Sequence, residues 1–327
     1  MWQSTVEQWR AIASEASDSR QCVVAENPSQ RHILGQLRAA GVFLSPIRGM
    51  YAETSEWELL SRSEQTIRVV RTLEARHPEW VFCSFTAAVL HGLWVSYADH
   101  FPLHVVTSPI WPTKSTRTII RHPMEDPECE EAQGVRVTSL EQTLFDCLAG
   151  LEFPAGLALA DSALRISGES RGHFLSYAKS HSSASGGSFA VDCLAHADAR
   201  AESGGESVAR AVMMEQGFMV PDIQVCIDDP LNPTNHYRVD YLWKLSDGSL
   251  VAGELDGREK YINADMTGGR STVDVLAEER LRESRLGAAG LRVMRFSYAD
   301  VCDTKRFSRL LEAYGIPRGP ARPRGRS

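Results

Sequence analysis

The clearest hydrophobic pattern lies in the last third of the chain. Apolar residues recur there at helical spacing, then in three short runs rich in β-branched and aromatic side chains, and then in a long helical stretch that ends at Gly290. A further apolar run and a last helical pattern follow. This αβββαβα order predicts a mixed sheet flanked by helices. The predicted helices are 207–216 and 272–289, and the predicted strands are 223–227, 237–243, 250–255 and 291–296.

The first 60 residues have a different pattern. Residues 5–18 and 30–40 have apolar positions at helical spacing, and residues 42–52 form a strand-like run that turns at Pro46 and Gly49. Helix, short helix or turn, helix and hairpin is the order of a winged helix-turn-helix, whose last helix enters the major groove of DNA. A small helical cap with a hairpin fits the same pattern. In the DNA-binding interpretation, the contacting side chains are Arg31, Arg38 and Arg48.

The middle of the chain alternates between the two kinds of pattern. Helices are predicted over 63–76, 84–91, 139–151 and 154–166, and strands over 103–108 and 116–122. The polar stretch 180–188 is the best candidate for a linker, and a loop between two helices is the alternative. We therefore expect a mixed α/β fold in four parts. The parts are a winged-helix-like unit (1–60), a mixed α/β region (61–180), a C-terminal α/β domain (201–315) and a disordered basic tail (316–327).

Length and composition are typical of a multidomain protein from a reducing compartment. A chain of 327 residues exceeds the usual size of a single core, and 43% hydrophobic residues can fill more than one core. The seven cysteines are scattered without a C-x-x-C pair, which argues against a disulfide framework and against a structural zinc site. The sequence has neither a signal-peptide pattern nor an apolar run of the roughly 18 residues that a membrane span needs. We expect a cytoplasmic protein that does not enter a membrane.

The overall charge argues against a simple nucleic-acid binder. The formal net charge is −7, whereas neutralising phosphates needs clustered Lys and Arg. Residues 1–60 carry five Arg against seven acids, so DNA binding by this part should be weak and strongly salt-dependent. Locally basic segments occur at 280–295 and in the tail, whose PRGPARPRGRS composition is typical of a disordered extension.

Three acidic residues in the C-terminal pattern are candidates for a metal site. Glu254 and Asp256 lie two residues apart on one predicted strand, so both carboxylates project from the same face of the sheet. Asp240 lies on the preceding strand and can return beside them. Three such carboxylates repel one another unless a divalent cation neutralises them, and hard oxygen ligands suit Mg²⁺ or Mn²⁺. Lys260 could then orient a water or hold a phosphate.

The spacing D-x13-E-x-D alone is a weak signal, because acids are common at strand ends and turns. A solvated turn is the competing interpretation. Glu254 shifts the balance, since it follows the apolar run 250–253 and therefore places a charge in a segment with a buried pattern.

Two family resemblances add to this picture and together cover most of residues 28–301. AESGGES (201–207), YRVDYLW (237–243), GELDGREKY (253–261) and the segment 277–301 resemble the very-short-patch-repair-type endonuclease domain of the PD-(D/E)XK superfamily. IRGMYA (47–52), SFTAAVLHGL (84–93), VRVTSLEQTLFDCL (135–148) and ALADSALR (158–165) are similar to AbiEi antitoxin-like regulators. The nuclease motifs are the more specific, because their order agrees with the αβββαβ pattern.

The nuclease resemblance implies a role for each acid. Glu206 is the acid on the helix, Asp240 and Glu254 are metal ligands, and Asp256 stands where the superfamily usually has its catalytic lysine. Catalysis would then need Lys260 as a substitute or Asp256 as a further metal ligand. Arg282 could contact phosphate, although an exposed helix with charges paired at i and i+4 explains this segment equally well.

These observations predict a DNA-associated protein with Mg²⁺-dependent (or Mn²⁺-dependent) phosphodiester cleavage. The missing lysine favours an alternative, a non-catalytic DNA-binding regulator or antitoxin with a degenerate nuclease fold. A third option is an antitoxin that binds a cognate toxin through an apolar patch on the middle region. Carboxylates within metal-ligand reach of one another would support cleavage, whereas divergent side chains would support the regulator.

Overall fold

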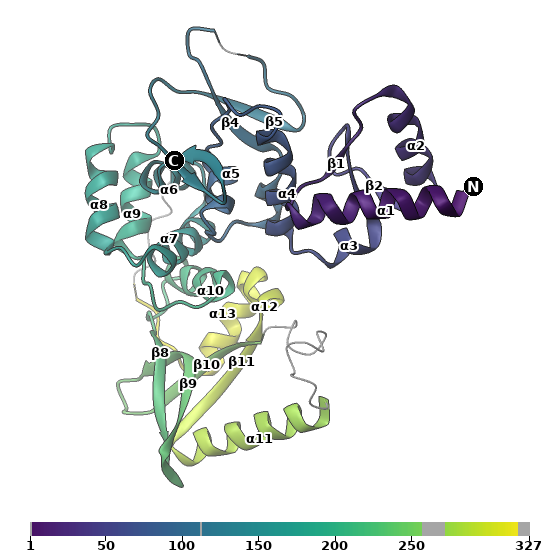
Figure 1. The fold of residues 1–327 in the computed structure, drawn as a ribbon. Helices are drawn as coiled ribbons and strands as arrows, with labels where there is room; N and C mark the ends of the chain where they lie inside the picture. Colours follow the sequence, from purple (N-terminus) through teal and green to yellow (C-terminus); the bar gives the residue numbers. More distant parts are fainter. Residues whose placement is uncertain (1, 112, 257–271, 320–327) are drawn as a thin grey trace. The chain divides into compact units, whose positions relative to one another are not determined.

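The structure is a computed structural model that describes residues 2–111, 113–256 and 272–319 (Figure 1). It confirms the mixed α/β class. The chain divides into two compact units, Met1–Cys147 and Leu148–Ser327. This division is coarser than the predicted four parts, which stay a prediction.

The first unit begins with two helices and a small antiparallel sheet of order β1-β3-β2. Asn27 caps the second helix, because its side-chain oxygen accepts from the Gln30 N–H at 2.9 Å, and Pro28 follows at the first helical position. The chain makes a strand between these helices, where the pattern allowed a short helix or a turn. The elements are α1 Trp2–Asp18, β1 Val23–Val24, α2 Pro28–Ala39, β2 Phe43–Leu44, β3 Met50–Glu53 and α3 Thr54–Leu59.

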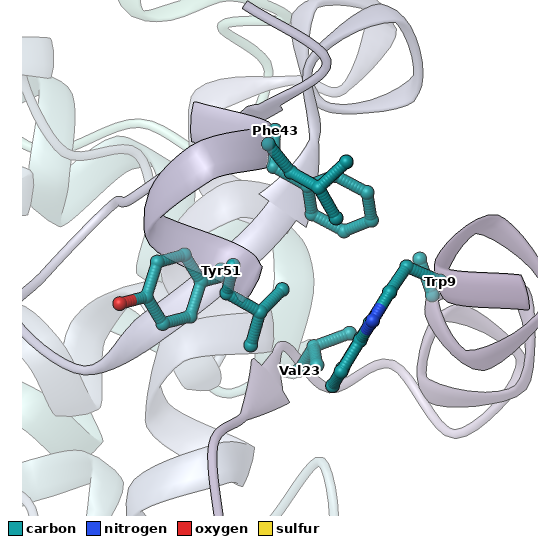
Figure 2. Close-up of a cluster of buried hydrophobic side chains, with 7 residues drawn as sticks. Trp9, Val23, Phe43 and Tyr51 are labelled. Carbon is teal, nitrogen blue, oxygen red and sulfur yellow. The ribbon is translucent and has the colours of Figure 1, made fainter. Parts of the chain in front are cut away.

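A small hydrophobic core joins these elements (Figure 2). Trp9 from α1, Val23 from β1, Phe43 from β2 and Tyr51 from β3 are all buried. Leu34 and Leu37 of α2 are completely buried in the same core. Burying each such side chain contributes roughly 1.5–3 kcal/mol, so this core fixes α2 against the sheet.

The remainder of the first unit combines helices with two strand pairs. β4 and β5 are parallel, whereas β6 and β7 are antiparallel. Phe82 is fully buried and bridges to Val105 of β4 and Val137 of β7. The hairpin of β6 and β7 was not predicted, because its first strand has the polar sequence CEEA and only the turn at Gln133-Gly134 marks it. The elements are α4 Arg62–Glu74, α5 Ser84–Leu90, η1 Tyr97–His100, β4 Leu103–Thr107, β5 Ile119–Pro123, β6 Cys129–Ala132, β7 Val135–Thr138 and α6 Leu140–Leu148.

The second unit begins with three helices, α7 Phe153–Ser167, α8 Arg171–Ser180 and α9 Gly187–Ala195. The polar stretch 180–188 contains the turn between α8 and α9. It is therefore a loop between two helices, which was the alternative to a linker. Gly187 is required there, since a Cβ at this position would lie 2.7 Å from the carbonyl oxygen of His181.

A four-stranded sheet of order β11-β10-β9-β8 forms the second half of this unit. β10 pairs parallel with β11 across the crossover helix α11, and the other pairs are antiparallel. The element order is the predicted αβββαβ, followed by two helices where the pattern predicted one. The elements are α10 Gly204–Glu215, β8 Asp222–Asp229, β9 Asn232–Lys244, β10 Leu250–Asp256, α11 Thr272–Ala288, β11 Leu291–Ser297, α12 Tyr298–Cys302 and α13 Thr304–Ala313.

Alternation along β10 gives this sheet a core on each face. Ala252 packs in a cluster with Leu286 of α11 and Leu291. The next residue, Gly253, lies against the Trp243 ring, which a Cβ would approach to 2.8 Å. Because successive strand residues point to opposite faces, α11 covers one face and the aromatic side chains fill the other.

A buried ion pair joins the first helices of this unit to the helix before the sheet. Asp161 of α7 is completely buried, and both its oxygens accept from the Arg210 guanidinium of α10, at 2.8 and 2.9 Å. Asp161 also accepts from the Asp198 N–H at 2.7 Å. Burial raises the pKa of Asp161, although Arg210 acts in the opposite direction.

The start of the basic tail is ordered, which corrects part of the predicted disordered segment 316–327. Ile316 is 3% exposed, and the Met219 N–H donates to the Pro317 carbonyl oxygen at 2.9 Å. The Arg318 guanidinium stacks over the Phe218 ring at 4.2 Å. Residues 320–327 lie outside the described part of the chain.

Candidate carboxylate site on the C-terminal sheet

The acid Glu254 lies inside the protein near the C-terminal end of β10. It follows three buried residues, Val251, Ala252 and Gly253, and is itself 6% exposed. Asp256, two residues on, is half-buried. The parallel register places Glu254 beside Arg295 of β11.

Two arginines neutralise Glu254. Nη1 of Arg282, from α11, lies 2.7 Å from Oε1 of Glu254, and Nη2 of Arg295 lies 3.4 Å from Oε2. A buried charge without such partners would cost several kcal/mol, so these contacts explain how an acid is tolerated in an apolar strand.

The two arginines have further partners that hold them in place. Arg282 also donates to the Arg238 carbonyl oxygen at 2.5 Å, and Nη1 of Arg295 lies 3.4 Å from a Glu279 carboxylate oxygen. Burial by itself would lower the pKa of Arg295, but attraction to the surrounding carboxylates raises this pKa overall. Those carboxylates are Glu254, Asp256, Glu279 and Glu283.

Asp240 lies close to the same end of β10. Its Oδ2 accepts from the Leu255 backbone N–H at 2.9 Å. This bond continues the contact between β9 and β10 beyond their last registered pair, Gly253 and Tyr241. The short turn after β9 therefore returns Asp240 beside the residue that follows Glu254.

Glu206 is engaged at the beginning of α10. Its two oxygens accept from the Ser203 hydroxyl at 2.8 Å and from the Glu202 backbone N–H at 3.0 Å. The Gln224 side-chain amide donates to it as well, at 2.8 Å. These bonds give Glu206 a structural role in capping the helix and joining it to β8.

The expected Mg²⁺ or Mn²⁺ site at Asp240, Glu254 and Asp256 stays a prediction. Within residues 2–111, 113–256 and 272–319, no three His, Cys, Asp or Glu side chains form a group that could hold a metal ion. The oxygens of Glu254 face guanidinium groups, and an oxygen of Asp240 faces a backbone N–H. Lys260, the expected substitute for the catalytic lysine, lies outside the described residues.

The predicted DNA-contacting residues divide into two kinds. Arg31 and Arg38 are exposed on α2, and Arg48 is exposed between β2 and β3. Within the described ranges none of these three forms an ion pair. Arg282 differs, because its guanidinium is engaged by Glu254.

Arg295 is the member of this site that the sequence analysis did not single out. It interrupts the apolar run 291–296 in the same way that Glu254 interrupts 250–255. Two opposite charges in two apolar strands indicate a buried ion pair. The sequence does not give the strand register that makes them neighbours, because that register forms only in the folded sheet.

Asp229, near the end of β8, is a second buried acid with a structural explanation. It is 4% exposed, and it accepts from the Tyr237 hydroxyl at 2.8 Å and the Leu231 N–H at 2.9 Å. Arg285 of α11 lies 3.6 Å away. These contacts close the β8–β9 hairpin and attach it to α11.

No helix in the described part of the chain combines the length and the apolar character needed to cross a bilayer.

No disulfide joins the seven cysteines, all of which the structure describes.

Comparisons with known proteins leave the family open. No protein-family model matches the chain, and no solved structure matches it. The chain is 28% identical over 163 residues to the uncharacterized protein Rv2248 of Mycobacterium tuberculosis strain H37Rv. It is equally similar to the uncharacterized protein MT2308 of strain CDC 1551 / Oshkosh. The match covers 50% of this chain and 58% of each relative's length.

Proposed function

We propose that this protein binds DNA and that its C-terminal domain, similar in sequence to PD-(D/E)XK nucleases, binds without cleaving. The observation that carries this proposal is the pairing of Glu254 with Arg282 and Arg295. A nuclease would direct these carboxylate oxygens at a divalent cation. Here two guanidinium groups supply positive charge to the Glu254 carboxylate without a metal.

The N-terminal part of the first unit supports DNA as the ligand. Arg31 and Arg38 lie seven residues apart on α2 and therefore share a face of the helix. α2 is the last helix before the β2–β3 connection, which carries Arg48. Residues 19–52 contain four Arg and one acid, a local charge of +3 within a chain of charge −7; Arg20 pairs with Glu64, and the other three Arg are exposed. This local excess is what contact with phosphates requires, and a winged helix-turn-helix would place it against duplex DNA.

Binding and cleavage by the full-length protein test the proposal together. We expect duplex DNA to bind in EDTA, measured by fluorescence anisotropy, and supercoiled plasmid to stay intact with Mg²⁺ or Mn²⁺. Arg38→Glu should weaken binding more than Arg76→Glu, since Arg76 is equally exposed but lies outside the basic segment. Nicking that Asp240→Ala abolishes and Asp228→Ala retains would overturn the non-cleaving assignment.

Metal-dependent cleavage is the second candidate, because one observation favours it. Asp240 of β9 accepts a hydrogen bond from the residue between Glu254 and Asp256, so the three predicted ligands lie near the C-terminal end of β10. A metal ligand at Glu254 would have to replace at least one arginine contact. Calorimetry with millimolar Mg²⁺ or Mn²⁺ distinguishes the candidates: binding that Asp240→Asn removes supports cleavage, and no binding supports the ion-pair interpretation.

The similarity to AbiEi regulators suggests the biological setting of a non-cleaving DNA binder. We propose transcriptional regulation or an antitoxin role, in which a cognate toxin would be a protein partner. Binding to the chain's own promoter DNA tests this role, and equal affinity for unrelated duplexes would argue against it.

A further inference from the structure

Two large apolar side chains in the connection between β4 and β5 are exposed to solvent. Ile110 is 75% exposed and Trp111 is 82% exposed. They are adjacent in the chain, so they form one apolar projection. Isolated exposed apolar residues are ordinary, but a neighbouring Ile and Trp on one loop are a feature of binding surfaces.

Hydroxyl groups fix the part of the loop that carries this projection. The Ser108 hydroxyl accepts from the backbone N–H of Ile110 at 3.2 Å and of Trp111 at 3.3 Å. The Thr107 and Thr113 hydroxyls lie 3.1 Å apart, on either side of the projection. The backbone thus has local partners, and Trp111 is presented outward without a hydrophobic partner inside the described parts of the chain.

The chain on either side of the projection carries only positive charges. No Asp or Glu occurs between Asp99 and Glu125, whereas Lys114, Arg117 and Arg121 lie in this stretch. Lys114 and Arg117 are exposed, and neither forms an ion pair within the described ranges. Arg121 instead lies over the Trp80 ring, at 4.9 Å from its centroid.

We infer that this loop binds single-stranded or unpaired DNA, with Trp111 stacking on a base and Lys114 and Arg117 contacting phosphates. Proteins that bind single-stranded DNA combine exposed aromatic rings with nearby cations. The rings stack on the bases, and the cations contact the negatively charged phosphates. A duplex hides its bases from such a ring. The ligand class rests on the proposed DNA binding, whereas the surface is separate from the arginines of α2.

The test compares loop variants of the full-length protein on a labelled oligothymidylate and on a duplex of equal length. Trp111→Ala should weaken single-strand binding roughly fivefold to a hundredfold and change duplex binding little. Leu59→Ala is the matched control, since Leu59 is 87% exposed in the same unit. Lys114→Glu should lower affinity and salt dependence on the single strand more than Arg76→Glu does.

Intrinsic fluorescence gives an independent readout. Stacking should quench Trp111, so oligothymidylate should quench the wild type more than Trp111→Phe. Equal quenching, or equal affinities of Trp111→Ala and Leu59→Ala for the single strand, would overturn the inference while leaving duplex binding by α2 intact. Single-strand binding through Trp111 with no duplex binding would support the loop site and remove the proposed role of Arg31, Arg38 and Arg48.

Discussion

In the C-terminal sheet, the buried acid Glu254 is paired with arginines, whereas the arginines in the segment from α2 to β3 of the first unit are exposed to solvent. Glu254 and Arg295 are partners across neighbouring strands. Arg31 and Arg38, by contrast, are exposed without an ion pair in the described residues. In an internal pair each charge already has a partner inside the protein, and removing one partner leaves the other buried without it. An exposed arginine without a partner is available for a ligand.

Four experiments test this contrast, in order of their expected effect on the free energy of unfolding.

Asp161→Ala should have the largest effect. It leaves the Arg210 guanidinium buried without its carboxylate, which typically costs about 3–5 kcal/mol. Urea denaturation of the full chain measures this loss. Arg200→Ala is the control, because its pairs with Asp198 and Asp222 lie at the surface and should contribute about 1 kcal/mol or less. Equal losses in the two variants would show that burial of the Asp161 pair has no special importance.

Truncation distinguishes the ordered start of the tail from the residues beyond it. A chain that ends at Gly315 loses the buried Ile316 and the Arg318 contacts, and we expect it to be about 2–4 kcal/mol less stable. A chain that ends at Gly319 keeps all of these contacts and should melt at nearly the wild-type temperature. Identical melting of both truncated chains would mean that Ile316 to Arg318 do not stabilise the fold.

The change in stability caused by Glu254→Gln has opposite signs if the site is a cluster of repelling carboxylates and if it is a set of ion pairs with arginines. Repulsion among three carboxylates predicts that removing a charge raises the melting temperature without metal. The contacts to Arg282 and Arg295 predict a loss instead, of roughly 1–3 kcal/mol, because two cations keep a neutral partner. Thermal denaturation in EDTA decides between them. Asp228→Asn, an exposed acid of β8, should change little.

The sequence allowed good prediction where a local pattern sets the structure. The strands of the second unit are short runs rich in β-branched and aromatic residues, and Gly217 and Gly290 mark the ends of helices, so their order was predictable. The polar strand of β6 gave no such pattern. Asp240 could be placed near Glu254 because one short turn joins their strands.

Local sequence patterns could not predict which residues from distant parts of the chain contact one another. Arg295 reaches Glu254 through a parallel register across a crossover helix, and Arg282 reaches it from that helix. The ordered tail depends likewise on a distant partner, Phe218. The prediction of a metal site considered the three acids alone. The arginines that contact Glu254 come from α11 and β11, and only the fold brings these elements beside it.

The arginines of the first unit should have the smallest effect on stability and a large effect on binding. Replacing Arg31, Arg38 and Arg48 together with Ala should change the unfolding free energy by only about 0.5 kcal/mol or less, because none has an ion pair to lose in the described structure. Each phosphate contact, however, contributes about 0.9 to the slope of log K against log salt for duplex DNA. The triple variant should therefore show a slope reduced by up to about 2.7, with weaker binding at every salt concentration. Arg76→Ala, outside the basic segment, should keep the wild-type slope. A triple variant with the wild-type slope would show that these exposed arginines are not the DNA contacts, and that the two regions differ in stability but not in ligand binding.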